Sequence, residues 1–122
     1  PLSGGGDGSD LEGLTLEEVR ADPVGSRGAI VTWELQKISL ERADAGRVEF
    51  AAGEPYLLMR PADLGTGRFV YVTIPEGSVQ DAQDFAPLER FTVRGRVRAG
   101  ASPITGGPVI ELIEMVRSRG PR

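Results

Sequence analysis

From Ala29 onward, apolar and polar residues alternate in several short segments, which is typical of β-strands. Within 31–35 every second residue is apolar, and the phase then shifts by one, because the next apolar positions are Ile38 and Leu40. One extra residue near Gln36 and Lys37 has this effect when it forms a β-bulge. The pattern therefore predicts a long strand that bends halfway along its length.

Further alternating segments follow, each bounded by glycine, proline or aspartate, as strands usually are. They cover Arg47–Phe50, Tyr56–Arg60, Arg68–Ile74, Phe91–Arg98 and Val109–Val116. No strand–helix–strand alternation is present, so a parallel sheet is not expected. We predict an all-β Greek-key barrel of five to six strands.

Two short helices accompany these strands. Thr15 is followed three residues later by Glu18, which is the spacing of a capping box, so a helix of about two turns is expected after Thr15. The polar segment 78–85 predicts a helical connector before the fourth main strand, with Ser78 as its candidate cap.

The ends of the chain differ from its middle in composition. Residues 1–14 begin with a polar, glycine-rich run and are predicted to be a flexible linker, residues 15–119 a single barrel domain, and residues 120–122 a disordered tail. The linker is either a cloning remnant or a spacer that followed an export signal or lipid anchor. A periplasmic or cell-surface location and a cytoplasmic one therefore both stay open.

The composition excludes several kinds of chemistry. The chain has no cysteine and no histidine, which removes disulfides, thiolate or imidazole zinc sites and histidine-assisted nucleophilic catalysis. The net charge is −4, which disfavours nucleic acid as a ligand because proteins that bind it non-specifically carry a basic excess. No run of about 18 apolar residues, the length that spans a membrane, is present. We expect no enzyme activity and no metal site.

Three segments give the chain a resemblance to the OB (oligonucleotide/oligosaccharide-binding) superfamily. They are the bent strand 29–41, the helical connector before Phe91, and the run Phe91–Val97, whose central glycine is typical of a strand at a sharp bend. Over residues 28–117 the chain is similar in particular to small bacterial OB domains of exported proteins and lipoproteins. A related OB-fold haem chaperone binds haem through histidine, so that role does not carry over, and no cofactor is expected.

The second and third main strands present a candidate ligand face. Arg60 marks the outward phase of its strand, which also places Tyr56 and Leu58 outward, while Phe69 and Tyr71 share the outward face of the next strand. With Arg68 these residues form an aromatic surface with basic flanks. The resemblance implies that single-stranded nucleic acid or sugars bind to this surface. Two other interpretations stay open: the large side chains fill the barrel while the valines face outward, or the first helix covers the surface.

Arg94, Arg96 and Arg98 form a basic stripe on one face of their strand. The stripe suits either a track of phosphates or cross-strand ion pairs with Glu111 and Glu114, and the ion pairs are the favoured interpretation. Trp33 shares the apolar face of the bent strand and is expected in the core.

Taken together, these observations predict a non-enzymatic OB-type domain that recognises a protein partner or a short polymeric ligand, either a saccharide or a single-stranded nucleic acid. The acidic net charge favours protein or saccharide. The alternative is a structural module of an exported or lipid-anchored complex.

Overall fold

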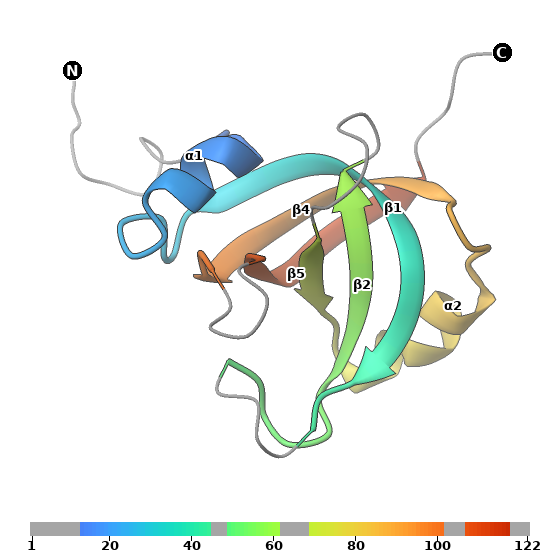
Figure 1. The fold of residues 1–122 in the computed structure, drawn as a ribbon. Coiled ribbons are helices and arrows are strands. Elements are labelled where there is room, and N and C mark those ends of the chain that lie inside the picture. Colours follow the sequence, from blue (N-terminus) through green and yellow to red (C-terminus); the bar gives the residue numbers. More distant parts are fainter. Residues whose placement is uncertain (1–12, 45–48, 62–68, 102–106, 118–122) are drawn as a thin grey trace, which may run out of the picture.

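The computed structural model describes residues 13–44, 49–61, 69–101 and 107–117, and these form a β-barrel with two short helices (Figure 1). The elements in chain order are α1 (Leu16–Ala21), β1 (Ile30–Arg42), β2 (Pro55–Pro61), β3 (Val70–Thr73), the 3-10 turn η2 (Glu76–Ser78), α2 (Val79–Asp84), β4 (Arg90–Ala99) and β5 (Val109–Arg117). Of the expected linker only Gly13 and Leu14 are described, and the tail lies outside the described residues. No helix among the described residues is long and apolar enough to cross a membrane.

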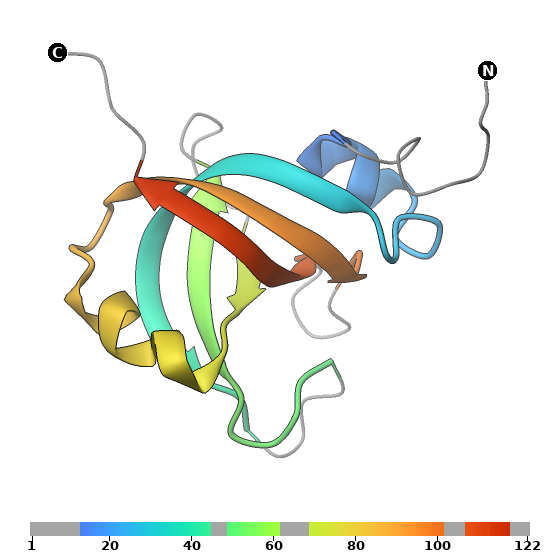
Figure 2. The same ribbon diagram turned by 180° about the vertical axis from the view of Figure 1, so that it is seen from behind.

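The strands close into a barrel in the order β1-β2-β3-β5-β4. β3 and β5 pair in parallel, and every other neighbouring pair is antiparallel. This arrangement confirms the predicted all-β, OB-type barrel. The strand expected at 47–50 is wrong for its second half, because Glu49 lies in a turn and Phe50 in a bend. Its first half lies outside the described residues. Figures 1 and 2 show α1 and α2 on opposite sides of the barrel.

The predicted bend of β1 is confirmed. Its first half pairs with β4 and its second half with β2, and the register with β2 shifts between Lys37 and Ser39. The bulge lets one strand turn the corner of the barrel and serve two neighbours, because an inserted residue bends the strand and increases its twist. After the shift Leu40 packs against the core, as the apolar pattern indicated, whereas the core cluster does not include Ile38.

Helix α1 begins with the capping box that the sequence predicts. Glu18 donates its backbone N–H to the Thr15 hydroxyl at 3.1 Å, and the Glu18 carboxylate accepts the Thr15 N–H at 2.8 Å. Leu16 and Val19 are its buried residues, and through these two side chains the helix packs against the barrel core.

Helix α2 connects β3 to β4, as expected, and is fixed at its carboxyl end by Lys37. The Lys37 ammonium donates to the backbone carbonyls of Ala82 at 2.9 Å and Phe85 at 2.7 Å. Cations favour helix C-termini because the last carbonyls lack intrahelical donors. Ser78 stands at the N-cap, but its side chain makes no capping hydrogen bond.

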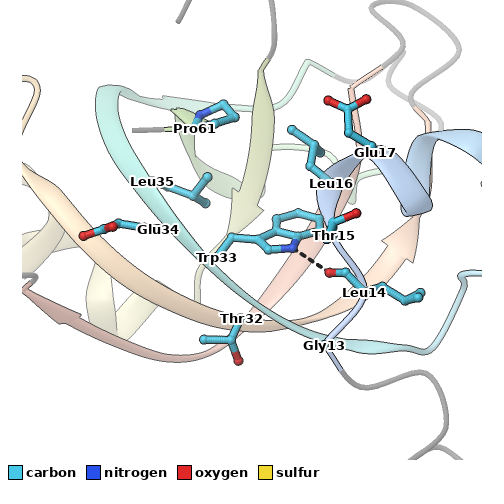
Figure 3. Close-up of a pocket in the computed structure, with 10 residues that line it drawn as sticks. All are labelled: Gly13, Leu14, Thr15, Leu16, Glu17, Thr32, Trp33, Glu34, Leu35 and Pro61. Carbon is cyan, nitrogen blue, oxygen red and sulfur yellow. Dashed lines mark hydrogen bonds between the residues drawn. The ribbon is translucent and has the colours of Figure 1, made fainter. Parts of the chain in front are cut away.

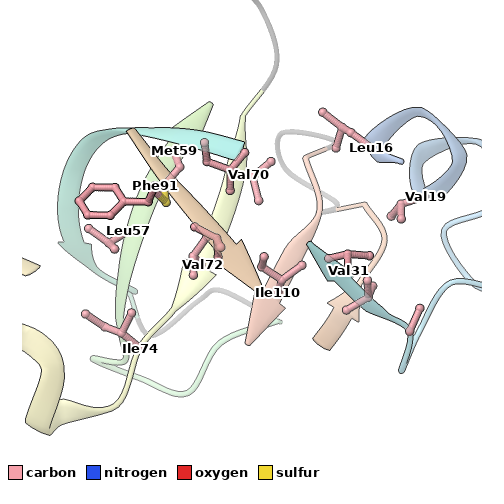
Figure 4. Close-up of a cluster of buried hydrophobic side chains, with 14 of the residues drawn as sticks. Leu16, Val19, Val31, Leu57, Met59, Val70, Val72, Ile74, Phe91 and Ile110 are labelled. Atoms are coloured by element: carbon pink, nitrogen blue, oxygen red, sulfur yellow. The ribbon is translucent and has the colours of Figure 1, made fainter. Parts of the chain in front are cut away.

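The core lies inside the barrel and reaches under α1. Figure 4 shows the buried side chains that β2, β3, β4 and β5 direct inward, together with those of α1 and β1. Its largest fully buried members include Phe91, Leu35, Leu57, Met59 and Ile110. Trp33, which the sequence placed in the core, is only partly buried and packs against the edge of this cluster.

Candidate functional site

The outer face of β2 and β3 has the orientation that the sequence predicts. Leu57, Met59, Val70 and Val72 are fully buried in the barrel core, so the intervening residues of both strands point out of the barrel. Leu58 pairs with Tyr71 across the two strands. The valines of β3 therefore face into the barrel, and the interpretation in which they face outward is wrong.

A second apolar cluster covers one end of this face. Tyr56 and Tyr71 are each only 5% exposed, because Phe50, from the β1–β2 connection, packs on both. The ring centroid of Phe50 lies 4.9 Å from that of Tyr56 and 6.3 Å from that of Tyr71, the latter edge to face. Such pairs add to the stability that burial gives. Phe50 therefore covers part of the two tyrosine rings, tilted against Tyr56 and edge-on to Tyr71.

The Tyr56 hydroxyl is also engaged, since it donates to the Glu41 carboxylate at 3.0 Å. Burial of a phenol generally requires such a partner. The sequence pattern identified Tyr56 and Tyr71 but not Phe50, which was assigned to a strand.

Arg98 fastens the β1–β2 connection over the face. Its guanidinium donates to both carboxylate oxygens of Glu54 at 2.8 and 2.9 Å and to the Glu49 backbone carbonyl at 2.9 Å. It also donates to Glu111 of β5 at 2.8 Å. The hydrogen bonds from Arg98 hold the pKa of Glu54 below its usual value, and those to Glu54 and Glu111 raise the pKa of Arg98. One side chain therefore holds both ends of the segment 49–54, which contains Phe50.

The other end of the face is open. Phe69 is 39% exposed, and Leu58 and Arg60 are partly exposed. The Arg60 Nε donates to the Gln36 amide oxygen at 3.1 Å, which holds the arginine against β1. Arg68 lies outside the described residues. The described open end is therefore an apolar surface with one positive charge.

The basic stripe of β4 faces glutamates on β5. Arg94 is opposite Glu114 and Arg96 is opposite Glu111, while Arg98 forms an ion pair with Glu111 as well as with Glu54. Opposite charges at facing positions of a solvated sheet stabilise it modestly. The favoured cross-strand ion pair is present between Arg98 and Glu111, whereas for Arg94 and Arg96 the structure gives the position opposite a glutamate.

Comparison with known proteins supports the fold. No protein-family model and no curated protein matches the chain. Among solved structures, the barrel is similar to part of the aspartyl tRNA synthetase from Entamoeba histolytica, with a TM-score of 0.58 and 14% sequence identity. The match covers 100% of this chain and 25% of the synthetase chain, so this chain corresponds to a quarter of that protein. At this identity the likeness establishes the fold alone.

Proposed function

We propose that this chain is a non-enzymatic OB-type binding domain that contacts a partner protein through the open end of the β2–β3 face. The observation that carries the proposal is an exposed phenylalanine, Phe69, which by strand alternation shares the outer face with the partly exposed Leu58 and Arg60. Aromatic residues and arginine are enriched in protein interfaces relative to the rest of the surface. Because the chain has neither cysteine nor histidine, we propose binding and not catalysis.

A protein partner is preferred to a polyanion because most of the candidate positive charge is engaged within the molecule. Arg98 is bonded to two glutamates, and Arg94 and Arg96 face glutamates across the sheet. A track for phosphates needs several cations that the ligand can neutralise. With a net charge of −4, the chain does not offer the overall attraction that such ligands require.

Single-stranded nucleic acid is the second candidate, because the barrel resembles part of a protein that is named for tRNA. A base would stack on Tyr56 or Tyr71 only after Phe50 had moved away, since Phe50 packs on both rings. This requirement makes nucleic-acid binding testable separately from protein binding.

Site-specific photo-crosslinking tests the proposal. A benzophenone side chain placed at Phe69 is expected to capture one defined protein in cells of the source organism, whereas the same group at Thr92, exposed on another face, captures none. Binding of the purified partner should weaken by about tenfold or more in Arg60→Glu and stay unchanged in Arg96→Glu, the matched control. Equal capture at both positions, or equal affinity of both variants, contradicts the proposal.

A titration with an oligonucleotide tests the second candidate, binding of single-stranded nucleic acid. A 12-base single-stranded RNA at low ionic strength is expected to produce no saturable change in the NMR signals of Leu58 and Phe69. Saturable binding that falls steeply with salt would replace the protein proposal with the nucleic-acid one, because counterion release is the signature of phosphate contacts.

A further inference from the structure

Two arginines flank Gln36 on the outer surface of the barrel. Gln36 is opposite Arg60 of β2 and also opposite Arg90 of β4, so the three residues form a row across three strands, here called the arginine row. Residues directly opposite each other in antiparallel strands point to the same face. The neighbouring Leu35 and Phe91 are buried in the core, so the side chains of the row point out of the barrel.

Gln36 connects the members of this row to the α2–β4 connection. Its amide oxygen accepts the Arg60 Nε–H at 3.1 Å, and its Nε2 donates to the Leu88 backbone carbonyl at 3.3 Å. A donor on one side and an acceptor on the other fix the orientation of the amide. Arg60 is thereby oriented before a ligand binds, which lowers the conformational entropy lost on binding.

The positive charge of the row is not balanced within the described part of the chain. Neither guanidinium of the row forms an ion pair with a carboxylate there, whereas Arg98 forms ion pairs with two glutamates. Glu34, two residues before Gln36, shares the outer face of β1, and Figure 3 shows its carboxylate on the side of β1 away from Trp33. The row therefore offers two positive charges to a ligand, with one carboxylate at its border.

An exposed leucine lies beside the row. Leu88 is 52% exposed and has a φ of 66°, in the left-handed region that leucine rarely adopts. It is the third residue of a turn closed by the Glu89 N–H, which donates to the Ala86 carbonyl at 3.1 Å, and glycine is usual at that position when φ is positive. The chain thus keeps an apolar side chain on its surface in a strained conformation. An apolar contact with a partner would account for it.

We propose that the arginine row binds an acidic side chain of the partner protein, and that Leu88 packs against an apolar neighbour of that acid. Because Arg60 also belongs to the open end of the β2–β3 face, this role rests on the proposed function and names the chemistry of its partner. The two arginines are about 10 Å apart at Cα, two strand spacings, so both can reach one carboxylate above Gln36. Such charge-assisted hydrogen bonds are stronger than neutral ones.

A nucleic-acid backbone fits this surface less well than an acidic peptide does. Two cations beside the carboxylate of Glu34 are too few for a track of phosphates. The exposed Leu88 side chain has no role in binding phosphates, whereas it suits an apolar residue next to an aspartate or glutamate.

Titration of the isotope-labelled full chain with a capped pentapeptide, Ala-Leu-Asp-Leu-Ala, tests the proposal by NMR. We expect saturable shifts of the Nε–H signals of Arg60 and Arg90, with a dissociation constant on the order of 1 mM, the affinity of a few contacts. The peptide Ala-Leu-Asn-Leu-Ala keeps the shape, removes the charge and should bind at least about threefold more weakly. Equal binding of the two peptides, no saturable shift up to about 10 mM, or equal shifts with inorganic phosphate would each overturn the proposal.

Single variants test the charges of the row. Arg90→Gln should weaken binding of the aspartate peptide at least about threefold. Arg96→Gln is the matched control, since it removes the same charge roughly 20 Å away along β4, beyond the range of unscreened attraction at about 0.1 M salt, and should leave the affinity unchanged. Glu34→Gln should instead strengthen binding, because it removes a carboxylate that repels the peptide. Unchanged affinity in Arg90→Gln, or weaker binding in Glu34→Gln, contradicts the proposal.

Leu88→Gly separates binding from stability. Glycine suits the positive φ, so the thermal midpoint should not fall, while the loss of the apolar contact should weaken binding of the aspartate peptide. A lower midpoint with unchanged affinity would overturn the role of Leu88. Binding that depends on Arg60 but not on Arg90 would overturn the row and leave the proposed function standing, whereas a crosslinker at Phe69 that captures no protein would overturn the proposed function itself.

Discussion

Arg98 and Glu54 form a two-point ion pair across the barrel, with Nη1 2.8 Å from Oε1 and Nη2 2.9 Å from Oε2. The two side chains are only 25% and 20% exposed, so solvent screens the pair less than it screens a surface ion pair. Since Arg98 also holds the Glu49 carbonyl, the described residues of the β1–β2 connection are bound at two points. Phe50 lies between these two points, which explains how its ring is kept over Tyr56 and Tyr71.

The Arg98–Glu54 pair gives the first prediction, which concerns pH. The folded-state pKa of Glu54 is lowered from 4.5, mainly by hydrogen bonds from Arg98. A carboxyl group whose folded pKa is depressed stabilises the fold above its unfolded pKa, and this contribution is lost as the pH falls through the folded pKa. Glu54→Gln should therefore lower the free energy of unfolding by about 1–3 kcal/mol at pH 7.

The difference between the wild type and Glu54→Gln should shrink as the pH is lowered below 4.5, and urea denaturation between pH 7 and 3 measures it. Glu76→Gln is the matched control. Glu76 also pairs with Arg42, but both groups are exposed, so no measurable change in the unfolding transition is expected. A Glu54→Gln deficit that persists unchanged at pH 3 would show that the ion pair is not its cause.

The second prediction concerns the cover over the tyrosines. Phe50→Ala removes the ring that packs on Tyr56 and Tyr71 and should lower the free energy of unfolding by about 3 kcal/mol. The ring protons of both tyrosines should shift in NMR spectra, because the ring current of Phe50 is lost. Phe69→Ala, at the open end of the same face, should cost less than about 1 kcal/mol. Unchanged tyrosine signals in Phe50→Ala would mean that Phe50 does not cover them in solution.

The residues differ in how far the sequence determined their placement. The phase of β2 and β3, the bulge after Lys37 and the capping box at Thr15 are local patterns, because each depends on residues a few positions apart. Local spacing also indicated that Arg98 shares a face with Arg94 and Arg96.

The contacts that cover the candidate face and that anchor α2 are not local. The bond from Arg98 to Glu54 spans 44 residues, and the bond from Lys37 to Phe85 spans 48. Whether Phe50 folds back onto the tyrosines depends on the path of a connection, and no periodicity encodes that path. The sequence could therefore identify the face but not its cover.

The third prediction tests the close approach of β4 and β5 at Gly95. A Cβ atom on Gly95 would lie 2.8 Å from the Glu111 backbone oxygen, so the two strands would have to separate. Gly95→Ala should lower the free energy of unfolding by about 1–3 kcal/mol, which is the usual cost of overpacking. Gly77→Ala is the control, since a Cβ there meets no atom within 4 Å. Equal thermal midpoints of the two variants would contradict this account of the glycine.

The fourth prediction concerns Lys37, the only lysine in the chain. Its ammonium is the donor that joins the bulge of β1 to the carbonyls of Ala82 and Phe85, and the residue is only 7% exposed. Lys37→Met keeps most of the volume but removes this donor from both carbonyls, so the free energy of unfolding should fall by about 3 kcal/mol.

Hydrogen exchange identifies the origin of that loss. Amide protons of α2 should exchange faster in Lys37→Met than in the wild type by more than those of β4 and β5, because the carboxyl end of the helix is no longer tied to the barrel. Arg90→Met removes one positive charge from an exposed position of β4 and should change neither the stability nor the exchange of α2. A uniform loss of protection across the barrel in Lys37→Met would indicate that Lys37 supports the core as a whole, and not α2 in particular.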